Sequence, residues 1–112
     1  MVWKKRRSGK FNVAPKAERT WQGITYDSKK EMTYAKQLDL LQRGGEIISI
    51  ERQVPYVFTI NAVKICTYKL DFKVVYANGR TEYIDVKGVK TDVYNIKKKL
   101  LKAMYGIDIK EV

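Results

Sequence analysis

The stretch CTYKLDFKVVYANGRTEYIDVKG, residues 66–88, decides how this chain folds. Two runs of apolar and polar residues in alternation flank the turn ANG, a pattern typical of a β-hairpin. A two-residue loop would pair Ala77 with Arg80. A three-residue loop, with Gly79 as the left-handed residue of a bulge, would pair Tyr76 with Arg80. The two registers turn opposite faces of the strands toward the core.

The apolar pattern favours the three-residue loop, because one face of the hairpin is then wholly apolar and the charged residues share the other. In this register Asp71 stands directly opposite Asp85, and Lys87 follows on the same face. Opposed like charges destabilise a sheet, so the two carboxylates need a cation or a shared proton. The alternative is a surface ladder of ion pairs without function. The apolar face consists of Leu70, Phe72, Val74, Ile84 and Val86.

The composition is that of one folded domain with a large positive charge. The chain has 112 residues, of which 45% are hydrophobic and 31% charged, enough for a single core. Its 23 Lys and Arg exceed its 12 Asp and Glu, which gives a net charge of +11. Such an excess makes nucleic acid the first partner to consider and an anionic membrane the second.

Two absences restrict the chemistry. The chain has no histidine, which excludes Ser-His and Cys-His nucleophiles and His-ligated zinc. Its single cysteine, Cys66, excludes an intrachain disulfide and a multi-cysteine zinc site. A metal would therefore bind to carboxylates and water, which suits Mg²⁺ or Mn²⁺. No apolar run has transmembrane length and MVWKKRRSGK has no apolar signal region, so we expect the protein in the cytoplasm.

We expect a basic N-terminal arm over residues 1–20 and a single domain over residues 21–112. The arm is either a solvated terminus or a segment that lies along phosphates. Its most concentrated charges are Lys4, Lys5, Arg6 and Arg7.

The first helix is expected between a cap at Asp27 or Ser28 and the glycine pair at 44–45. Glu31 lies at the N-terminal end of its apolar stripe. The segment SKKE fits a capping box, in which Glu31 bonds back to the cap amide, and the residues alone favour this role. The apolar stripe consists of Tyr34, Ala35, Leu38 and Leu41.

The pattern over residues 46–60 indicates a strand, in which Pro55 marks an edge, a bulge or a break. A second helix is expected from Thr91 to Gly106, followed by a short strand in IDIKEV. Its stripe of Val93, Ile96, Leu100 and Met104 is expected to face the core, with its lysines largely in water.

These elements resemble the PD-(D/E)xK nuclease superfamily, through Asp71, the D-x-K of Asp85 and Lys87, and the preceding helix acid Glu31. More narrowly, SKKE, IERQVPY, YKLDF, DVKG and KKKLLKAMYGI resemble small phage-encoded proteins related to Holliday-junction resolvases. The resemblance implies an α/β, restriction-endonuclease-like core in the order helix, three strands, helix, strand, with a mixed central sheet flanked by helices. Leu70 replaces the nominal proline, and Asp85 stands where glutamate is commoner.

The resemblance implies a Mg²⁺- or Mn²⁺-dependent endodeoxyribonuclease. Asp71, Asp85 and the carbonyl of Val86 would hold the metal, and Lys87 would stabilise the attacking hydroxide. It also favours Glu31 as an additional metal ligand or water-orienting acid rather than only a cap. Gln53 matches a strand position near the site in some relatives.

DNA would be bound through phosphates by the arm and by lysines after the site, a mode that suits branched DNA better than a base sequence. Two symmetric cuts in a four-way junction imply a homodimer. The alternatives are a non-catalytic nucleic-acid-binding module, a duplex-cutting transposase or restriction-like endonuclease, and a structural RNA-binding protein of ribosomal type. The lysines are Lys90, Lys97, Lys98, Lys99 and Lys102.

Overall fold

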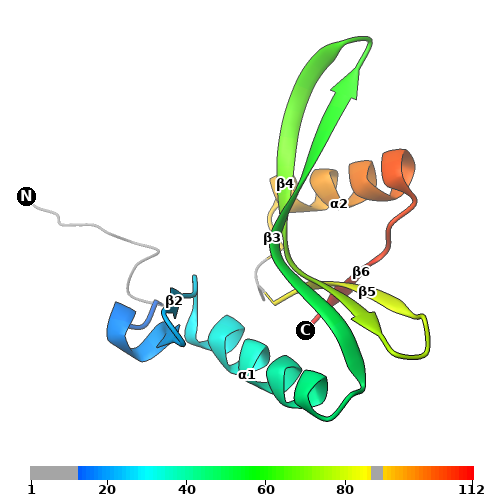
Figure 1. Ribbon diagram of the computed structural model, residues 1–112. Coiled ribbons are helices and arrows are strands. Elements are labelled where there is room, and N and C mark those ends of the chain that lie inside the picture. Colours follow the sequence, from blue (N-terminus) through cyan, green and yellow to red (C-terminus); the bar gives the residue numbers. More distant parts are fainter. Residues whose placement is uncertain (1–12, 87–89) are drawn as a thin grey trace, which may run out of the picture. The chain divides into compact units, whose positions relative to one another are not determined.

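The computed structural model describes residues 13–86 and 90–112 (Figure 1). The chain divides into two compact units, Met1–Gln37 and Leu38–Val112. The first contains a 3-10 turn and a two-stranded ribbon, and the second contains a four-stranded mixed sheet with a helix packed on it. Helix α1 begins in the first unit and ends in the second. The elements are η2 (Lys16–Arg19), β1 (Thr20–Trp21), β2 (Ile24–Thr25), α1 (Lys29–Arg43), β3 (Ile47–Ile60), β4 (Val63–Tyr76), β5 (Thr81–Asp85), α2 (Asp92–Tyr105) and β6 (Ile109–Glu111).

From α1 onward the order is helix, three strands, helix, strand, as the sequence predicts. Before α1, sequence reasoning missed η2 and the β1–β2 ribbon, in which the two-residue turn Gln22-Gly23 has positive φ at both positions. There, Arg19 Nε donates a hydrogen bond to the Ala14 carbonyl at 2.9 Å, so this arm residue binds its own backbone. The basic cluster at Lys4 to Arg7 lies outside the described residues, and the single domain over residues 21–112 stays a prediction.

The sheet has the strand order β3-β4-β5-β6, with antiparallel pairing except between β5 and β6, which are parallel. Helix α2 connects these two parallel neighbours, as a parallel pair requires a crossover. Strand β3 is therefore an edge strand, and it runs through Pro55 without a break. Of the three readings of Pro55, the edge is confirmed, because a residue that lacks an N–H is tolerated where no second strand needs that donor.

The β4–β5 hairpin has the predicted three-residue register. Tyr76 N donates to the Arg80 carbonyl at 2.8 Å, and Gly79 has φ +89°, a conformation that favours glycine. The ladder runs as far as Phe72 opposite Ile84, so Asp71 and Asp85 occupy the next opposed positions. All members of the predicted apolar face are buried: Leu70, Phe72, Val74, Ile84 and Val86.

Local signals define both ends of α2. Thr91 is the N-cap, and its hydroxyl accepts a hydrogen bond from Tyr94 N at 3.1 Å. Gly106 is the C-cap in the left-handed conformation, with φ +70°. Both residues are the boundaries that the sequence predicts.

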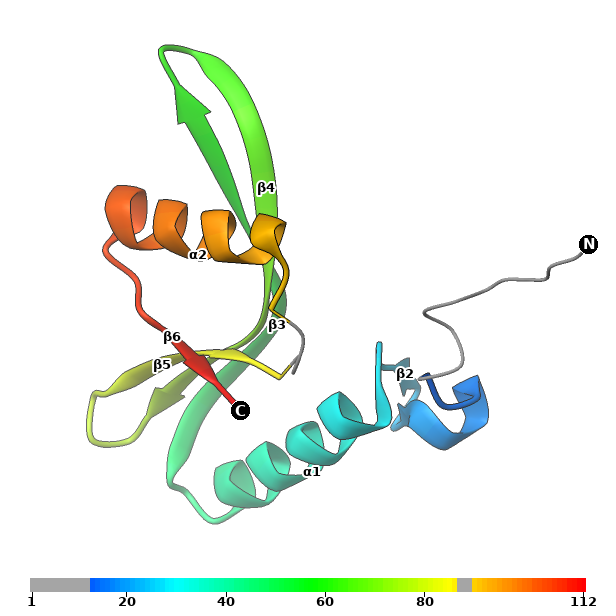
Figure 2. The ribbon, with the colours of Figure 1, turned by 180° about the vertical axis from the view of Figure 1, so that it is seen from behind.

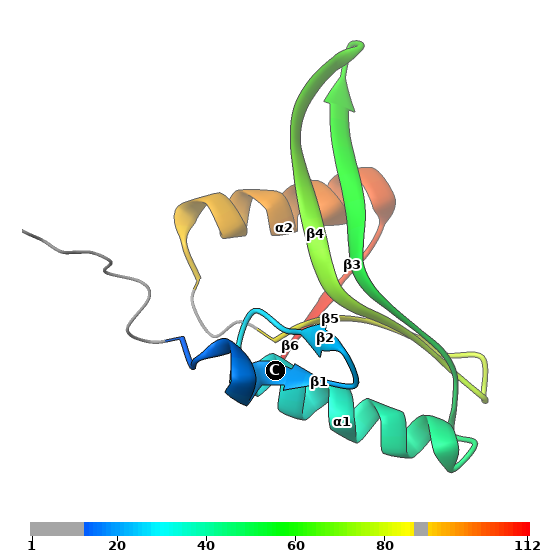
Figure 3. The same ribbon diagram turned by 60° about the vertical axis from the view of Figure 1, so that its left-hand side comes forward.

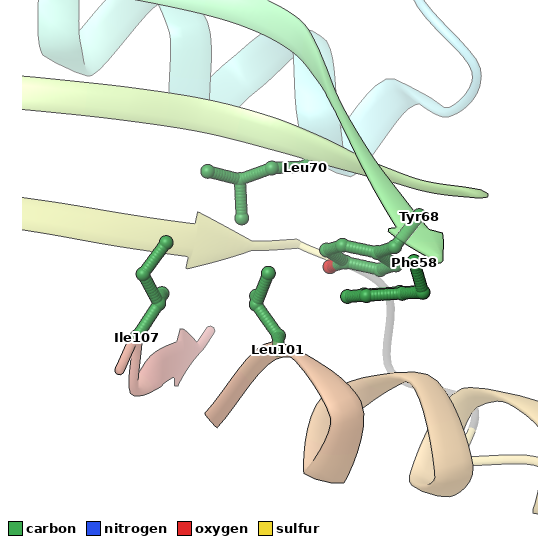
Figure 4. Packing of buried hydrophobic residues seen from close by; sticks show 5 residues of the cluster. All are labelled: Phe58, Tyr68, Leu70, Leu101 and Ile107. Atoms are coloured by element: carbon green, nitrogen blue, oxygen red, sulfur yellow. The ribbon is translucent and has the colours of Figure 1, made fainter. Parts of the chain in front are cut away.

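The predicted buried stripe of α2 is wrong at three of its four positions, whereas the fourth, Leu100, is partly buried and packs against the core. Val93, Ile96 and Met104 are 61%, 58% and 41% exposed, whereas Leu101 is fully buried. The helix packs through a neighbouring face, and Figure 4 shows Leu101 directed toward Leu70 and Tyr68. Two apolar stripes lie side by side on this helix, and the position of the sheet selects the one that contains Leu101. The core cluster consists of Phe58, Tyr68, Leu70, Leu101 and Ile107.

The far half of the β3–β4 hairpin, residues 57–67 and here called the hairpin arm, projects past α2 (Figures 1 to 3). Tyr105 of α2 holds its base by donating to the Val57 carbonyl at 2.7 Å. Val57 lies opposite Thr67, and Ile60 opposite Val63. Four aliphatic side chains of the hairpin arm are exposed: Val57, Ile60, Val63 and Ile65. Ile60 and Val63 form one rung and share a face, whereas Val57, three residues before Ile60, lies on the other face.

We predict that Leu101→Ala lowers the free energy of unfolding by about 2–5 kcal/mol, because truncating a fully buried leucine leaves a cavity. Met104→Ala, on the exposed stripe, should change it by less than about 0.5 kcal/mol. Urea denaturation of both variants measures the difference. Equal losses, or a larger loss for Met104→Ala, would contradict the packing of α2.

Candidate active site

Asp71 and Asp85 are both buried, each with 3% of its surface exposed. This excludes the exposed ion-pair ladder as an interpretation of these two carboxylates. The Val86 N–H donates to Asp71 Oδ2 at 2.8 Å, and the Tyr68 hydroxyl donates to Asp85 Oδ2 at 2.6 Å. Buried carboxylates require such donors, because desolvation of a charge is costly.

The Tyr68 hydroxyl remains a proton donor at every physiological pH. Burial of the ring is the larger cause, and the hydrogen bond to Asp85 the smaller cause, of a pKa of Tyr68 far above its ordinary value. Tyr68 comes from the same strand as Asp71, and its ring belongs to the core cluster. The core therefore fixes the donor that orients the Asp85 carboxylate.

A third acid continues the row across the sheet. In the parallel β5–β6 ladder Glu111 lies opposite Asp85, so Asp71, Asp85 and Glu111 occupy neighbouring positions on three successive strands. The Glu111 side chain is engaged by the start of α2: the Tyr94 hydroxyl donates to it at 2.6 Å, and Lys90 and Lys98 approach it to 3.2 and 3.4 Å.

These contacts make the Glu111 carboxyl group more acidic than an ordinary glutamic acid. The hydrogen bond from Tyr94, together with Lys90 and Lys98 and against the opposing effect of burial, lowers the pKa of Glu111 from 4.5 to about 2. In return, burial and the hydrogen bond to Glu111 raise the pKa of Tyr94 above its ordinary value. Glu111 is therefore ionised at neutral pH, and it ties the first turns of α2 to strand β6.

Gln53 occupies the β3 position that the flanking rungs of the ladder set opposite Asp71, and its backbone has φ +52° within a strand. A non-glycine residue in this region costs about 1–3 kcal/mol, and such strain is concentrated at functional sites. Its position next to Asp71 agrees with the proximity to the site that the resemblance implies. The rungs on either side pair Arg52 with Phe72 and Val54 with Leu70.

Glu31, in the first unit, lies in a variant of the capping box, in which its carboxylate binds the amide of Asp27 before the cap residue Ser28 instead of the cap amide itself. Glu31 N donates to Ser28 Oγ at 3.0 Å, and the Asp27 N–H donates to Glu31 Oε1 at 3.0 Å. The cap role is thereby confirmed. Its second role, as a metal ligand or water-orienting acid, stays a prediction.

A pocket of about 480 Å³, here called the Asp85 pocket, opens between β4, the end of β5 and the start of α2. This volume is within the range of small-molecule sites. It combines one acid, two cations and aromatic walls. The lining residues are Thr67, Tyr68, Lys69, Asp85, Thr91, Val93, Tyr94 and Lys97.

The lysines of α2 do not form one uniform solvated face. Lys97 is half-buried and lines the Asp85 pocket, whereas Lys99 is exposed and lines a second pocket with Lys98 and Lys102. Lys102 pairs with Asp108 at 2.9 Å. Lys97 is thus the helix lysine that shares a pocket with a site carboxylate. Lys87 lies outside the described residues.

The donor set suits a hard divalent cation. Two opposed carboxylates and an adjacent backbone carbonyl supply oxygen ligands, and Mg²⁺ commonly takes only one or two carboxylates and keeps its waters. Within residues 13–86 and 90–112, no group of three or more His, Cys, Asp or Glu side chains is arranged to hold a metal ion.

Sequence reasoning missed Glu111, Tyr68 and Tyr94. Tyr68 stands in the YKLDF strand three residues before Asp71, and only the approach of β5 brings its hydroxyl to Asp85. Helix α2 separates Glu111 from Asp85 in the sequence, so no local spacing indicates that these two residues lie opposite each other. A prediction that the last strand pairs in parallel with β5 would have found Glu111.

Fold and site define a mixed α/β protein with a buried pair of carboxylates at the end of its sheet. The chain belongs to a family described as "Protein of unknown function (DUF1064)", whose family model matches residues 10–111. No curated protein and no solved structure matches the chain. Among the described residues, no helix is long and apolar enough to span a membrane.

We predict that Glu111→Gln destabilises the protein in a pH-dependent way. The pKa of Glu111 is lowered on folding, so its stabilising contribution is complete above about pH 4.5 and is lost as the pH falls toward 2. The free energies of unfolding of wild type and variant should differ most at neutral pH and converge on acidification. Urea titrations between pH 7 and the lowest pH that retains the fold measure this.

Glu51→Gln is the matched control, because Glu51 is exposed and its ion pair with Lys73 is long, at 4.0 Å. Its stability difference from wild type should be small at every pH. A constant difference for Glu111→Gln across the same range would contradict the ionic role of Glu111.

Proposed function

We propose that this protein is a metal-dependent endonuclease that hydrolyses phosphodiesters in branched DNA, most specifically a Holliday-junction resolvase. The observation that carries the proposal is the buried, opposed pair of Asp71 and Asp85. Burying two like charges in neighbouring positions is unfavourable unless a cation or a shared proton compensates them, and the metal is the solution that also supplies chemistry at this site. The element order from α1 to β6 agrees with the restriction-endonuclease-like core that the resemblance implies.

In the proposed reaction Asp71 and Asp85 hold Mg²⁺ or Mn²⁺, with the Val86 carbonyl as a further ligand. When bound, the cation supplies Lewis-acid polarisation of the phosphoryl oxygen and an acidified water. Tyr68 keeps the Asp85 carboxylate oriented through its hydrogen bond. Lys87 stabilises the attacking hydroxide and the charge that grows on the phosphate. The assignment of Lys87 and the catalytic role of Glu31 rest on the sequence resemblance.

DNA binding is supported by the net charge of +11 and by the position of Lys97 beside Asp85. Lys90 and Lys98 both form ion pairs with Glu111, so they are less available to bind phosphates. Lys97, Lys99 and the basic N-terminal segment are then the main phosphate contacts. Contacts of this kind are sensitive to salt and carry little sequence information.

We predict paired, Mg²⁺-dependent cuts in an end-labelled four-way junction and none in a matched linear duplex. Asp85→Asn and Asp71→Asn should each lower the cleavage rate by more than about 100-fold, because each removes a metal ligand worth several kcal/mol of charge stabilisation. EDTA should abolish cleavage. Gel assays of wild type and both variants provide the measurement.

Asp108→Asn controls for the loss of one negative charge, since Asp108 is well exposed, and it should retain activity. Lys87→Ala should abolish cleavage while it leaves junction binding largely intact. Tight binding without any cut would contradict the enzymatic activity and favour the alternative of a non-catalytic binding module. Equal cutting of the duplex would favour a transposase or restriction-like endonuclease.

The proposal includes a homodimer, because two symmetric cuts require two sites. The hairpin arm supports it: this two-stranded ribbon exposes four aliphatic side chains, and such ribbons are marginal alone. Copies with a charge of +11 repel each other, so these aliphatic side chains are the favourable place for contact. They are Val57, Ile60, Val63 and Ile65.

We predict that sedimentation velocity finds a dimer at micromolar concentration and that Ile65→Asp raises its dissociation constant by at least about tenfold, as for a central interface residue. Ile48→Asp is the matched control, because Ile48 is also exposed on β3 but lies outside the arm. Wild type that sediments only as monomer, free and with junction DNA, would overturn the dimer.

A further inference from the structure

The Asp85 pocket has two aromatic side chains in its wall, and carboxylates hold both of them in place. The rings of Tyr68 and Tyr94 have centroids 6.3 Å apart and planes inclined at 52°, so they do not stack on each other. The Tyr68 hydroxyl is bound to Asp85 and the Tyr94 hydroxyl to Glu111, each at 2.6 Å. This wall is therefore preorganised rather than formed on binding.

Two cations line the pocket, one from each of the two elements that bound it. Lys69 belongs to β4 and Lys97 to α2, and Asp85 lies in the same pocket. Val93, which is 61% exposed, adds an apolar edge. An aromatic and apolar wall between two cations matches a nucleotide, whose base is apolar on its faces and whose neighbouring phosphates are anionic.

We propose that the Asp85 pocket receives one unstacked nucleotide of the DNA strand that passes the site carboxylates, an inference that rests on the proposed function. The base packs against Tyr94 and Val93, and Lys69 and Lys97 contact the flanking phosphates. Removing a base from the stack is least costly where it is unpaired. The preferred substrates are therefore DNAs with an unpaired nucleotide beside the cut, together with four-way junctions, whose bases at the point of strand exchange are less costly to unstack than those of a continuous duplex.

This inference gives structure selectivity a physical origin within a single chain. A pocket that accepts any base by stacking does not read sequence, because every base has a π-face. A fully paired duplex lacks an accessible nucleotide for it. The preference for DNA with an accessible nucleotide is then a property of binding, and it does not require cleavage.

The test measures binding by fluorescence anisotropy in EDTA, with labelled duplex that has one unpaired nucleotide and with the fully paired duplex. Wild type should bind the first about tenfold more tightly, in line with the stacking of one base. Val93→Trp fills the pocket entrance and should abolish this preference. Ile96→Trp, on the same helix with 58% exposure and outside the pocket, should retain it.

Lys97→Gln and Lys99→Gln form a second matched pair. Each removes one charge from α2, but only Lys97 lines the Asp85 pocket. Both should weaken overall binding, and only Lys97→Gln should reduce the preference for the unpaired nucleotide. This pair keeps the inference testable if Val93→Trp does not fold.

The two proposals fail separately. Cleavage of junctions by a protein whose binding preference is the same in Val93→Trp and Ile96→Trp would overturn the pocket and leave the nuclease. A preference that is lost in Val93→Trp, in a protein that cuts nothing, would support the pocket and remove the enzyme. Equal binding of both DNAs by wild type would overturn the pocket outright.

Discussion

The left-handed turn at Gly79 is the constraint on which the arrangement of the site depends. It allows a three-residue loop, which pairs Tyr76 with Arg80 and so sets every later rung of the β4–β5 ladder. A slip of one residue would reverse the two faces of the hairpin and expose its apolar side chains. The same register that buries Phe72 and Ile84 places Asp71 opposite Asp85. Core formation and site formation are thus one event in this hairpin.

The acids at the end of the sheet are held by a network of donors. Asp71 binds the Val86 amide and Asp85 binds the Tyr68 hydroxyl, while Glu111 takes Tyr94 and two lysines. Satisfied networks of this kind stiffen their surroundings, because each buried group would be costly without its partner. The network joins β4, β5, β6 and the start of α2, which are the elements around the Asp85 pocket. Stability and the shape of the pocket therefore depend on the same side chains.

Local chemistry was predictable where a few adjacent residues decide the outcome. The Thr91 cap, the Gly106 stop and the capping box at Glu31 all depend on contacts within a turn of helix. The buried face of α2 was not predictable in this way. Two apolar stripes share that helix, and the choice of the one with Leu101 depends on where Phe58, Tyr68 and Leu70 lie.

The sequence by itself determined the order of the elements from α1 onward, the hairpin register and the opposition of Asp71 and Asp85, because local caps, a glycine turn and a period of two fix these over short distances. Only the tertiary structure decided the rest of the site. Glu111 lies opposite Asp85 because β5 and β6 pair in parallel, although α2 separates these strands in the sequence. Tyr68 and Tyr94 reach their carboxylate partners through packing. Such contacts follow from how the sheet and α2 come together, which no local pattern encodes.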